Sequence, residues 1–370
     1  MVLNLFKKKS SDNNDKKASD NKYVTLTFKE IIRETADAVS VMFENPDGGL
    51  DYQSGQFLTL ILTINGEKVR RAYSLCTSPF VDEFPAVTIK RVKGGLMSNY
   101  IPDNMKAGDK IEVMKPMGVF TTTYEPSNER HMILYGGGSG ITPLMSIAKS
   151  TLEKEPMSSV SLVYANRNED SIIFKDTLNE LADEYGDRIQ VVHVLDEAPL
   201  NWTGPSGLLE PPLLADLVSQ LPDMGENNTE HFICGPEGMM KNVEQGLGIL
   251  KVPADRIHKE SFVASKTDKA DLPKEKGEEV GHEVTVIYEG EEHKFAVAPG
   301  KTILETALDQ DIDLPFSCQS GLCTACRGKC LSGKVKLDED EGLSQSELDE
   351  GFVLTCVGHP LTDDVVIEIG

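Results

Sequence analysis

Cysteine is the residue type most unevenly distributed along this chain of 370 residues. There are seven cysteines, and five of them lie in the last quarter of the sequence, at positions 318, 323, 326, 330 and 356. An odd, clustered set of cysteines without a recognisable export signal favours metal binding over disulfide pairing. The first chemistry that the sequence predicts is therefore ligation of a metal centre by thiolates near the C-terminus.

The spacing of four of these cysteines indicates the kind of centre. Cys318, Cys323 and Cys326 are separated by four and by two residues, and Cys356 follows after 29 more. This is the spacing of plant-type [2Fe–2S] clusters. Each iron of such a cluster takes two thiolates besides its bridging sulfides, so four cysteines are required. The short side chains between them allow backbone N–H groups to turn toward the sulfurs.

Three other interpretations of the cysteines remain open: a structural zinc site, a [4Fe–4S] cluster that uses Cys330, and a group of thiols that only packs. Zinc ribbons favour two Cys-x2-Cys pairs. The bacterial [4Fe–4S] run has one more cysteine and usually a proline after the last, where this chain has Leu331. The [2Fe–2S] cluster is therefore favoured, with Cys330 as a buried bystander and Cys76 as a structural residue.

Length and charge bound what surrounds this centre. A chain of 370 residues is expected to form two or three domains. No apolar run reaches the roughly 20 residues that span a bilayer, so we expect a soluble, cytoplasmic protein. A net charge of −23 argues against nucleic acid as a partner. From residue 282 onward 18 Asp and Glu face 6 Lys and Arg, which could steer a basic partner or simply be solvated surface.

The order of predicted elements gives a multidomain fold. Short β-rich runs over 22–125 predict an antiparallel β-barrel, and alternating strands and helices over 126–262 predict a doubly wound parallel α/β sheet. Two strands joined by a turn at 289–292, a helix that begins with a capping box at Thr302 and Glu305, and the cysteine-rich loop predict an α+β domain of the β-grasp kind over 282–370. Residues 263–281 have the composition of a linker, and residues 1–21 that of a disordered tail or, less favoured, a short peripheral anchor.

Four short motifs in the first two domains occur in a recognisable order. They are Arg71-Ala72-Tyr73-Ser74, then Ile89-Lys90 with Gly95-Leu96-Met97-Ser98, then Gly136-Gly137-Gly138-Ser139-Gly140-Ile141-Thr142-Pro143, and finally Cys234-Gly235-Pro236. The third follows a predicted strand and precedes a predicted helix, where glycines commonly admit a pyrophosphate. It lacks the usual third glycine, because Pro143 occupies that position.

Together these motifs resemble those of the ferredoxin-NADP reductase superfamily, over about residues 22–370. The chain looks most like reductases with a flavin barrel, a nucleotide domain and a C-terminal ferredoxin, as in phenylacetyl-CoA epoxidase and related oxygenases. The resemblance implies FAD, an NADPH or NADH substrate and a [2Fe–2S] cluster. It also implies a protein electron acceptor, an oxygenase component. Other acceptors, such as a hybrid-cluster protein, and a role as a non-catalytic redox sensor remain open.

The resemblance also implies roles for individual residues. Ser74, Cys234 and Glu260 would be catalytic, near the atoms that exchange hydride. By its position after the second strand of the nucleotide domain, Arg167 could hold a 2′-phosphate at the adenosine ribose and lean the preference toward NADPH, or could equally form a surface ion pair. The residues implied for flavin are Arg71, Ala72, Tyr73, Ser74, Ile89, Lys90, Gly95, Leu96, Met97, Ser98, Thr142 and Phe262. Those implied for the nucleotide are Gly137, Gly138, Gly140, Arg167, Cys234, Gly235 and Pro236. Those implied for the cluster are Cys318, Cys323, Cys326 and Cys356.

Overall fold

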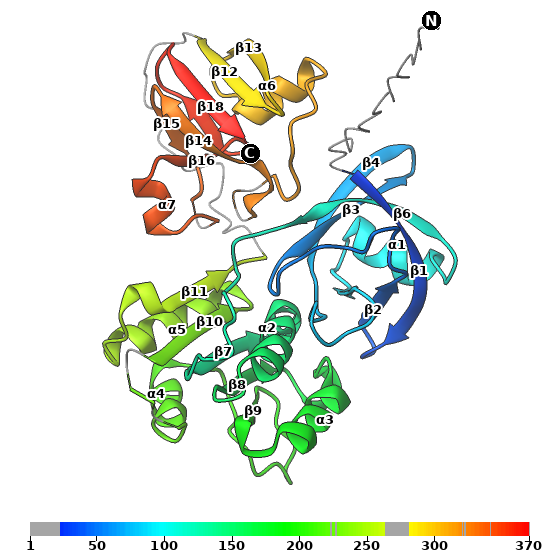
Figure 1. Cartoon of the computed structure of the whole chain (residues 1–370), viewed down its shortest axis with the longest axis vertical. Coiled ribbons are helices and arrows are strands. Elements are labelled where there is room, and N and C mark those ends of the chain that lie inside the picture. Colours follow the sequence, from blue (N-terminus) through cyan, green and yellow to red (C-terminus); the bar gives the residue numbers. More distant parts are fainter. Residues whose placement is uncertain are drawn as a thin grey trace, which may run out of the picture.

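The computed structural model describes residues 23–222, 224–225, 228–262, 281–319, 321, 323–340 and 342–369. Figure 1 shows three bodies that follow one another along the chain, a blue to cyan barrel, a green α/β layer structure and a yellow to red domain. The tail predicted at 1–21 and almost all of the predicted linker 263–281 lie outside the described residues. The exact domain boundaries stay predictions.

The first body is a curled antiparallel sheet of six strands in the order β4-β3-β6-β1-β2-β5. Its elements are β1 Tyr23–Arg33, β2 Ala38–Phe43, β3 Phe57–Ile64, β4 Glu67–Ser74, β5 Ala86–Lys90, α1 Leu96–Asn104 and β6 Lys110–Met117. An isolated antiparallel bridge between Leu75 and Val87 joins the ends of the two edge strands, so the sheet closes on itself. Buried residues from all six strands fill its interior, as the predicted barrel requires.

The second body is a parallel five-stranded sheet in the order β11-β10-β7-β8-β9. Its strands are β7 His131–Gly137, β8 Ser159–Asn166, β9 Ile189–Leu195, β10 Thr229–Cys234 and β11 Ile257–Glu260. Its helices are α2 Ile141–Lys154, α3 Lys175–Tyr185, α4 Pro211–Ser219 and α5 Glu237–Ile249, with short 3-10 turns at Gly138–Gly140, Glu169–Ser171, Gly186–Arg188 and Ala254–Arg256.

Helices cover both faces of this parallel sheet. Buried residues of α2 and α3 form one core and those of α4 and α5 form a second, so the doubly wound fold is confirmed. The chain runs from β7 outward to β9 and then returns to β10 on the other side of β7. Doubly wound sheets bind their ligands at such a reversal, which here lies beyond the carboxyl ends of β7 and β10.

The third body combines a five-stranded sheet, β13-β12-β18-β14-β16, with a small pair, β15-β17. Its elements are β12 His282–Tyr288, β13 Glu291–Val297, α6 Ile303–Asp309, the 3-10 turn Thr324–Cys326, β14 Arg327–Ser332, β15 Val335–Leu337, α7 Gln345–Asp349, β16 Phe352–Leu354, β17 Gly358–Pro360 and β18 Val365–Ile369. The predicted hairpin turns over two residues, Glu289 and Gly290, which both have positive φ, as a type I′ turn requires. The predicted capping box of Thr302 and Glu305 begins α6.

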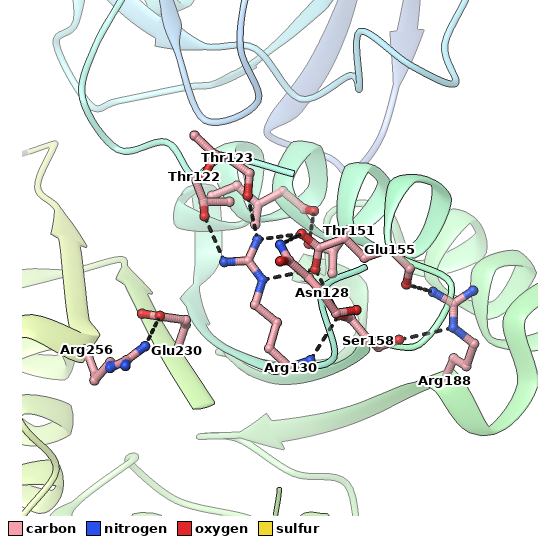
Figure 2. A network of polar contacts seen from close by, with 11 residues as sticks. Thr122, Thr123, Asn128, Arg130, Thr151, Glu155, Ser158, Arg188, Glu230 and Arg256 are labelled. Atoms are coloured by element: carbon pink, nitrogen blue, oxygen red, sulfur yellow. Dashed lines mark hydrogen bonds and ion pairs between the residues drawn. The ribbon is translucent and has the colours of Figure 1, made fainter. Parts of the chain in front are cut away.

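A buried ion pair fastens the connection between the first two bodies, as Figure 2 shows. The guanidinium of Arg130 donates to both carboxylate oxygens of Glu155, at 3.0 and 2.7 Å, and to Thr122 Oγ1 and the Thr123 carbonyl. Glu155 is fully buried and also accepts from Asn128. The segment that leaves the barrel is therefore held against the end of α2.

The lengths of the helices bear on membrane association. Among the residues that the structure describes, no helix is both long enough and apolar enough to cross a membrane.

Candidate functional site

Two glycine-rich loops meet at the reversal in strand order of the parallel sheet, one after β7 and one after β10. A Cβ atom built on Gly140 would lie 2.0 Å from the carbonyl oxygen of Cys234, and one on Gly137 would lie 2.6 Å from Pro236 Cδ. Gly235 approaches the backbone of Gly137 in the same way, with a Cβ distance of 3.0 Å. We attributed these glycines to the close approach of a pyrophosphate. The structure shows that some of them are also needed because one loop packs directly on the other.

The loop after β7 is also tied to its surroundings through Gly138. This residue has a φ of +51°, which favours glycine, and its carbonyl accepts a hydrogen bond from the Tyr164 hydroxyl at 2.9 Å. Thr142 donates to the Ser139 carbonyl at 3.0 Å, so its hydroxyl is used within the loop. Sequence reasoning missed Tyr164, whose position near the end of β8 is the only signal for it.

The helical run that contains α2 begins with the 3-10 turn Gly138–Gly140, because the Ile141 N–H donates to the carbonyls of Gly138 and Ser139, so the end available for an anion is the start of that turn. Gly140 caps the helix without a side-chain hydrogen bond, and the first turn contains no acidic residue. The N–H groups of a first turn have no partner inside the helix, and the helix dipole favours negative charge there. The loop and this turn therefore fit the diphosphate of a dinucleotide.

The three residues predicted as catalytic come from three strands and lie together. The register of the parallel strands β10 and β11 pairs Cys234 with Glu260. At the end of barrel strand β4, Ser74 Oγ donates to Glu260 Oε2 at 3.2 Å. The barrel therefore touches the carboxyl end of the parallel sheet at the point where the sequence placed hydride exchange.

Burial controls the charge of this group of residues. It raises the pKa of Glu260 to about 8, against the opposing effect of the hydrogen bond from Ser74. Burial, with the nearby Glu260, raises the pKa of the Cys234 thiol well above its ordinary value. Both groups are therefore protonated at neutral pH. Cys234 suits close packing rather than nucleophilic attack, and Glu260 can hold a proton near the reacting atoms.

The Arg71-Ala72-Tyr73-Ser74 motif occupies the end of β4, so its side chains alternate between the two faces of the strand. Arg71 is exposed, and its guanidinium donates to the carbonyl of Arg70 at 2.7 Å. Tyr73 is half-buried against the barrel core, which raises its pKa to about 12. The exposed guanidinium of Arg71 can bind a phosphate, and the neutral ring of Tyr73 can pack against a flavin ring beside it.

A second candidate phosphate site begins α1. Gly95 caps this helix without a side-chain hydrogen bond, and no acidic residue stands in its first turn. Ser98 Oγ accepts from the backbone N–H of Val92 at 3.2 Å, and a Cβ on Gly95 would lie 2.5 Å from that oxygen. Asn99, which sequence reasoning missed, donates to the carbonyls of Val92 and Gly95 and fixes the turn. Its place directly after the Gly-rich run is the signal that could have identified it.

The remaining flavin residues are placed differently. Met97 and Ile89 are buried in the barrel core, whereas Leu96 is 47% exposed. Lys90 reaches toward the nucleotide loop, since a Cβ on Gly138 would lie 3.6 Å from its Nζ. Ile89 and Met97 can therefore offer only backbone atoms to a cofactor.

Two predicted residues stand at the surface. Phe262, two residues after Glu260, exposes 41% of its surface, as a ring that stacks on a ligand must. Arg167 follows β8 and is exposed, while its carbonyl accepts from the N–H of Glu197 at 2.7 Å. The backbone at the ribose end is thus fixed, with the Arg167 guanidinium at the surface.

The four predicted ligand cysteines lie in mutual contact. The backbone N–H of Cys318 points at Cys323 Sγ and that of Cys323 at Cys318 Sγ, both at 3.4 Å. Cys356, 30 residues from Cys326 in sequence, comes close enough to Cys318 and Cys326 for their thiols to raise its pKa. Four thiols with backbone N–H groups directed at two of the sulfurs fit a [2Fe–2S] cluster.

The other two cysteines in question are apart from this group. Cys76 is buried, and its thiol donates to the Ala86 carbonyl at 3.3 Å, as a structural residue does. The prediction that Cys330 is buried is wrong. It lies on β14, partly exposed at the margin of the domain core where the pairing with β18 is irregular, and its thiol donates to the Ser332 carbonyl at 3.1 Å.

One cleft of about 740 Å³ joins the reacting region to the cluster loop. Its walls include Glu260 and Ser261 from the parallel sheet, Phe120 from the connection, and Cys323 and Thr324 from the cysteine loop. A group bound between the sheet edge and the loop would therefore approach both Glu260 and a cluster ligand. This geometry suits electron transfer from a flavin bound at the sheet edge to a cluster held by the cysteine loop.

Family models cover most of the described chain in three successive segments. Residues 23–122 match an oxidoreductase FAD-binding domain, 134–245 an oxidoreductase NAD-binding domain, and 286–361 a 2Fe-2S iron-sulfur cluster binding domain. The cofactor types that the motifs predicted are thereby confirmed. The three segments follow the order of the three bodies described above.

Relatives match over nearly the whole chain. The chain is 38% identical to the ferredoxin reductase component of 3-ketosteroid-9-alpha-monooxygenase from Rhodococcus rhodochrous, over 93% of this chain and 96% of that protein. It is 35% identical to a component of 1,2-phenylacetyl-CoA epoxidase from Escherichia coli, over 93% and 97%. Phthalate dioxygenase reductase, a modular structure for electron transfer from pyridine nucleotides to [2Fe-2S], has the same fold, with a TM-score of 0.58 and 24% identity over 94% and 98% of the two chains.

The motifs, the fold and the relatives agree on one assignment. The chain belongs to the family of FAD- and NAD-binding oxidoreductases that carry a C-terminal 2Fe-2S domain, the family of these oxygenase reductase components.

Proposed function

We propose that this protein takes hydride from NADPH or NADH and delivers single electrons to an oxygenase component. The observation that carries the proposal is the convergence of Ser74 and Cys234 on Glu260, which lines a cleft whose wall also includes Cys323. Nicotinamide gives up two electrons together, as hydride, whereas a [2Fe–2S] cluster accepts one electron at a time. FAD between them would take the pair and release it as single electrons. The named functions of the relatives support an oxygenase as the acceptor.

The residues of this chain would do the following work. The start of the 3-10 turn before α2 and the loop that leads to it bind the nucleotide diphosphate, and Cys234 packs beside the nicotinamide. Arg71 and the first turn of α1 hold the flavin phosphates, while Ser74 and Glu260 hold a hydrogen-bonded proton near the ring. Cys318, Cys323, Cys326 and Cys356 hold the cluster.

We further propose a modest preference for NADPH and a cytoplasmic location. The proposal is supported by the exposed Arg167, which directly follows β8, the strand end at which such folds read the ribose, and by the lack of an acidic side chain among residues 159–166 to favour the ribose hydroxyl. A cytoplasmic location supplies reduced nicotinamide nucleotide directly.

The proposal is tested by anaerobic titration of the purified protein with NADPH and, separately, with NADH. Absorbance near the flavin band and the EPR signal of a reduced [2Fe–2S] cluster are followed together. Flavin bleaching with growth of the cluster signal supports the route, and the rates with the two nucleotides measure the preference. Bleaching without a cluster signal contradicts electron delivery through the cluster, and no change in either signal contradicts the reductase function.

The cluster loop should be needed for delivery and not for hydride transfer. In Cys323→Ser we expect reduction of ferricyanide to persist, because this small acceptor can take electrons from the flavin, and reduction of cytochrome c to be lost. Steady-state rates with both acceptors measure this, with Cys330→Ser as the matched control that should retain both activities. Equal loss of both activities in Cys323→Ser would count against a route through the cluster.

A further inference from the structure

A buried arginine joins the barrel to the iron–sulfur domain. Arg70 lies on β4 directly before Arg71, and its side chain is only 7% exposed. Its Nη2 atom donates to Asp313 Oδ1 at 3.2 Å, although Asp313 lies 243 residues further along the chain. Its guanidinium also stacks over the ring of Phe316, 4.2 Å from the ring centroid.

A tyrosine completes this contact from the barrel side. Tyr23 donates through its hydroxyl to Asp313 Oδ2 at 2.9 Å and accepts from Arg70 Nη2 at 3.2 Å. Both carboxylate oxygens of Asp313 therefore accept hydrogen bonds from residues of the barrel. Arg70 Nη1 is also buried and has no hydrogen-bond partner among the described residues, so Asp313 supplies the countercharge of a largely desolvated cation.

On both sides, the residues of this contact are close in sequence to residues that we propose take part in electron transfer. On the barrel side, β4 runs from Arg70 through Arg71 to Ser74, the residue that contacts Glu260. On the other side, Phe316 stands two residues before Cys318, the first cysteine of the cluster loop. A shift of this contact would move the cluster ligands relative to the flavin strand.

We propose that Arg70 is a positioning residue that sets the distance between the flavin strand and the cluster loop, through its contact with Asp313 and Phe316. This proposal rests on the proposed function. Arg70 has no part in binding nucleotide or exchanging hydride. Its contribution is to the step in which electrons pass from the barrel side to the iron–sulfur domain. Guanidinium is suited to the task, since its flat face stacks on Phe316 while its edge donates to Asp313.

Three variants test the contact from both sides. Arg70→Ala removes the charge and the stacking, and Arg70→Lys keeps the charge without the planar fork. Asp313→Asn leaves the arginine in place without a countercharge, so the contact should open to allow water to reach it. Lys294→Ala is the matched control, because Lys294 pairs with Glu283 inside the iron–sulfur domain, at 3.0 Å, and both side chains are exposed.

The first readout is stopped-flow reduction by NADPH, which separates flavin bleaching from cluster reduction. We expect flavin bleaching at the wild-type rate in all variants, and cluster reduction slowed by about tenfold or more in Arg70→Ala and Asp313→Asn, because misplacement by an ångström is costly to a pre-arranged transfer. Arg70→Lys should be intermediate and Lys294→Ala unchanged. A wild-type rate of cluster reduction in both Arg70→Ala and Asp313→Asn would overturn the proposal.

The second readout needs no electron transfer. Hydrogen–deuterium exchange of the segment 311–317 should be faster in Arg70→Ala and Asp313→Asn than in the wild type or Lys294→Ala, because these backbone amides lose a docked partner. Unchanged exchange would overturn the proposal as well. If the wild-type cluster itself is not reduced by either nucleotide while exchange responds to the variants, the proposed function fails and the docking contact stands.

Discussion

At the scale of single residues, Glu260 makes the candidate site sensitive to pH near neutrality. Its pKa of about 8 lies above the ordinary value of a glutamate because burial penalises the charged form. A carboxyl whose pKa is raised on folding stabilises the protein fully below its unfolded pKa, and this contribution is lost as pH rises through the folded pKa. Stability should therefore fall between about pH 4.5 and 8 through this one group.

The corresponding prediction uses Glu260→Gln, which keeps the shape and cannot ionise. As pH rises toward 9, we expect this variant to become more thermally stable than the wild type. We also expect that its rate of flavin reduction no longer changes with pH near pH 8, as the wild-type rate should. Melting temperatures and stopped-flow rates at several pH values measure both effects. Glu244→Gln, an exposed carboxylate in the wall of the same cleft, is the control and should follow the wild type. A wild-type pH profile in Glu260→Gln would remove Glu260 from the reaction.

The role of a residue could be predicted from the sequence only where its neighbours along the chain identify it. The four ligand cysteines and Ser74 are recognisable because spacing and short motifs specify them. Arg70 is not, because its partner Asp313 lies 243 residues away and strand alternation says only that it faces away from Arg71. The burial of Cys330 was predicted wrongly for the same reason, since how far other elements cover a position on β14 is a tertiary property.

At the scale of elements, the loops after β7 and β10 have to pack on each other before either can bind a nucleotide. Gly140→Ala would place a methyl group 2.0 Å from the backbone of Cys234, where no side-chain movement can relieve it. We expect a loss of about 1–3 kcal/mol in the free energy of unfolding, together with a higher KM for the nucleotide. Urea denaturation and steady-state kinetics measure these two quantities.

A second glycine provides the comparison for this variant. Gly248 lies in α5 with nothing within 4 Å of a built Cβ. Gly248→Ala should leave the kinetics unchanged and stabilise the helix by up to about 1 kcal/mol. Equal stability of the two variants would show that the loops can separate without cost.

The sequence was informative about elements wherever the hydrophobic pattern is strong. Strands such as Ala86–Lys90 and Ile189–Leu195 can be recognised in the sequence, because apolar residues dominate them and turn residues follow. The turn at Glu289 and Gly290 is shorter than expected, since positive φ at both positions allows two residues to reverse the chain. How the two glycine loops share space could not be predicted, because that depends on strand order rather than on either loop.

At the scale of the whole molecule, three bodies must keep fixed relative positions for electrons to cross between them. Motif order predicted which bodies exist and which cofactors they hold. The contacts that position them carry no local signature: Arg70 bonds to Asp313, and Arg130, paired with Glu155, also bonds to Thr122 and Thr123 at the end of the barrel segment. Their effect is on geometry between domains, which is why each is best tested by variants of both partners.

The Arg130 contact gives the largest expected effect on stability. Arg130→Met leaves the carboxylate of Glu155, which is fully buried, without its cation, and this should cost about 3–5 kcal/mol of unfolding free energy. The double variant Arg130→Met/Glu155→Met should recover much of that loss, because two apolar side chains can replace a buried ion pair with little net change.

Lys241→Met, from an exposed pair with Glu237, should alter stability by less than about 1 kcal/mol. Chemical denaturation of the wild type and these three variants measures the losses and the recovery. If the double variant is as unstable as the single one, the network of Thr122, Asn128 and Ser158 around the pair, rather than its charge, holds the barrel to the parallel sheet.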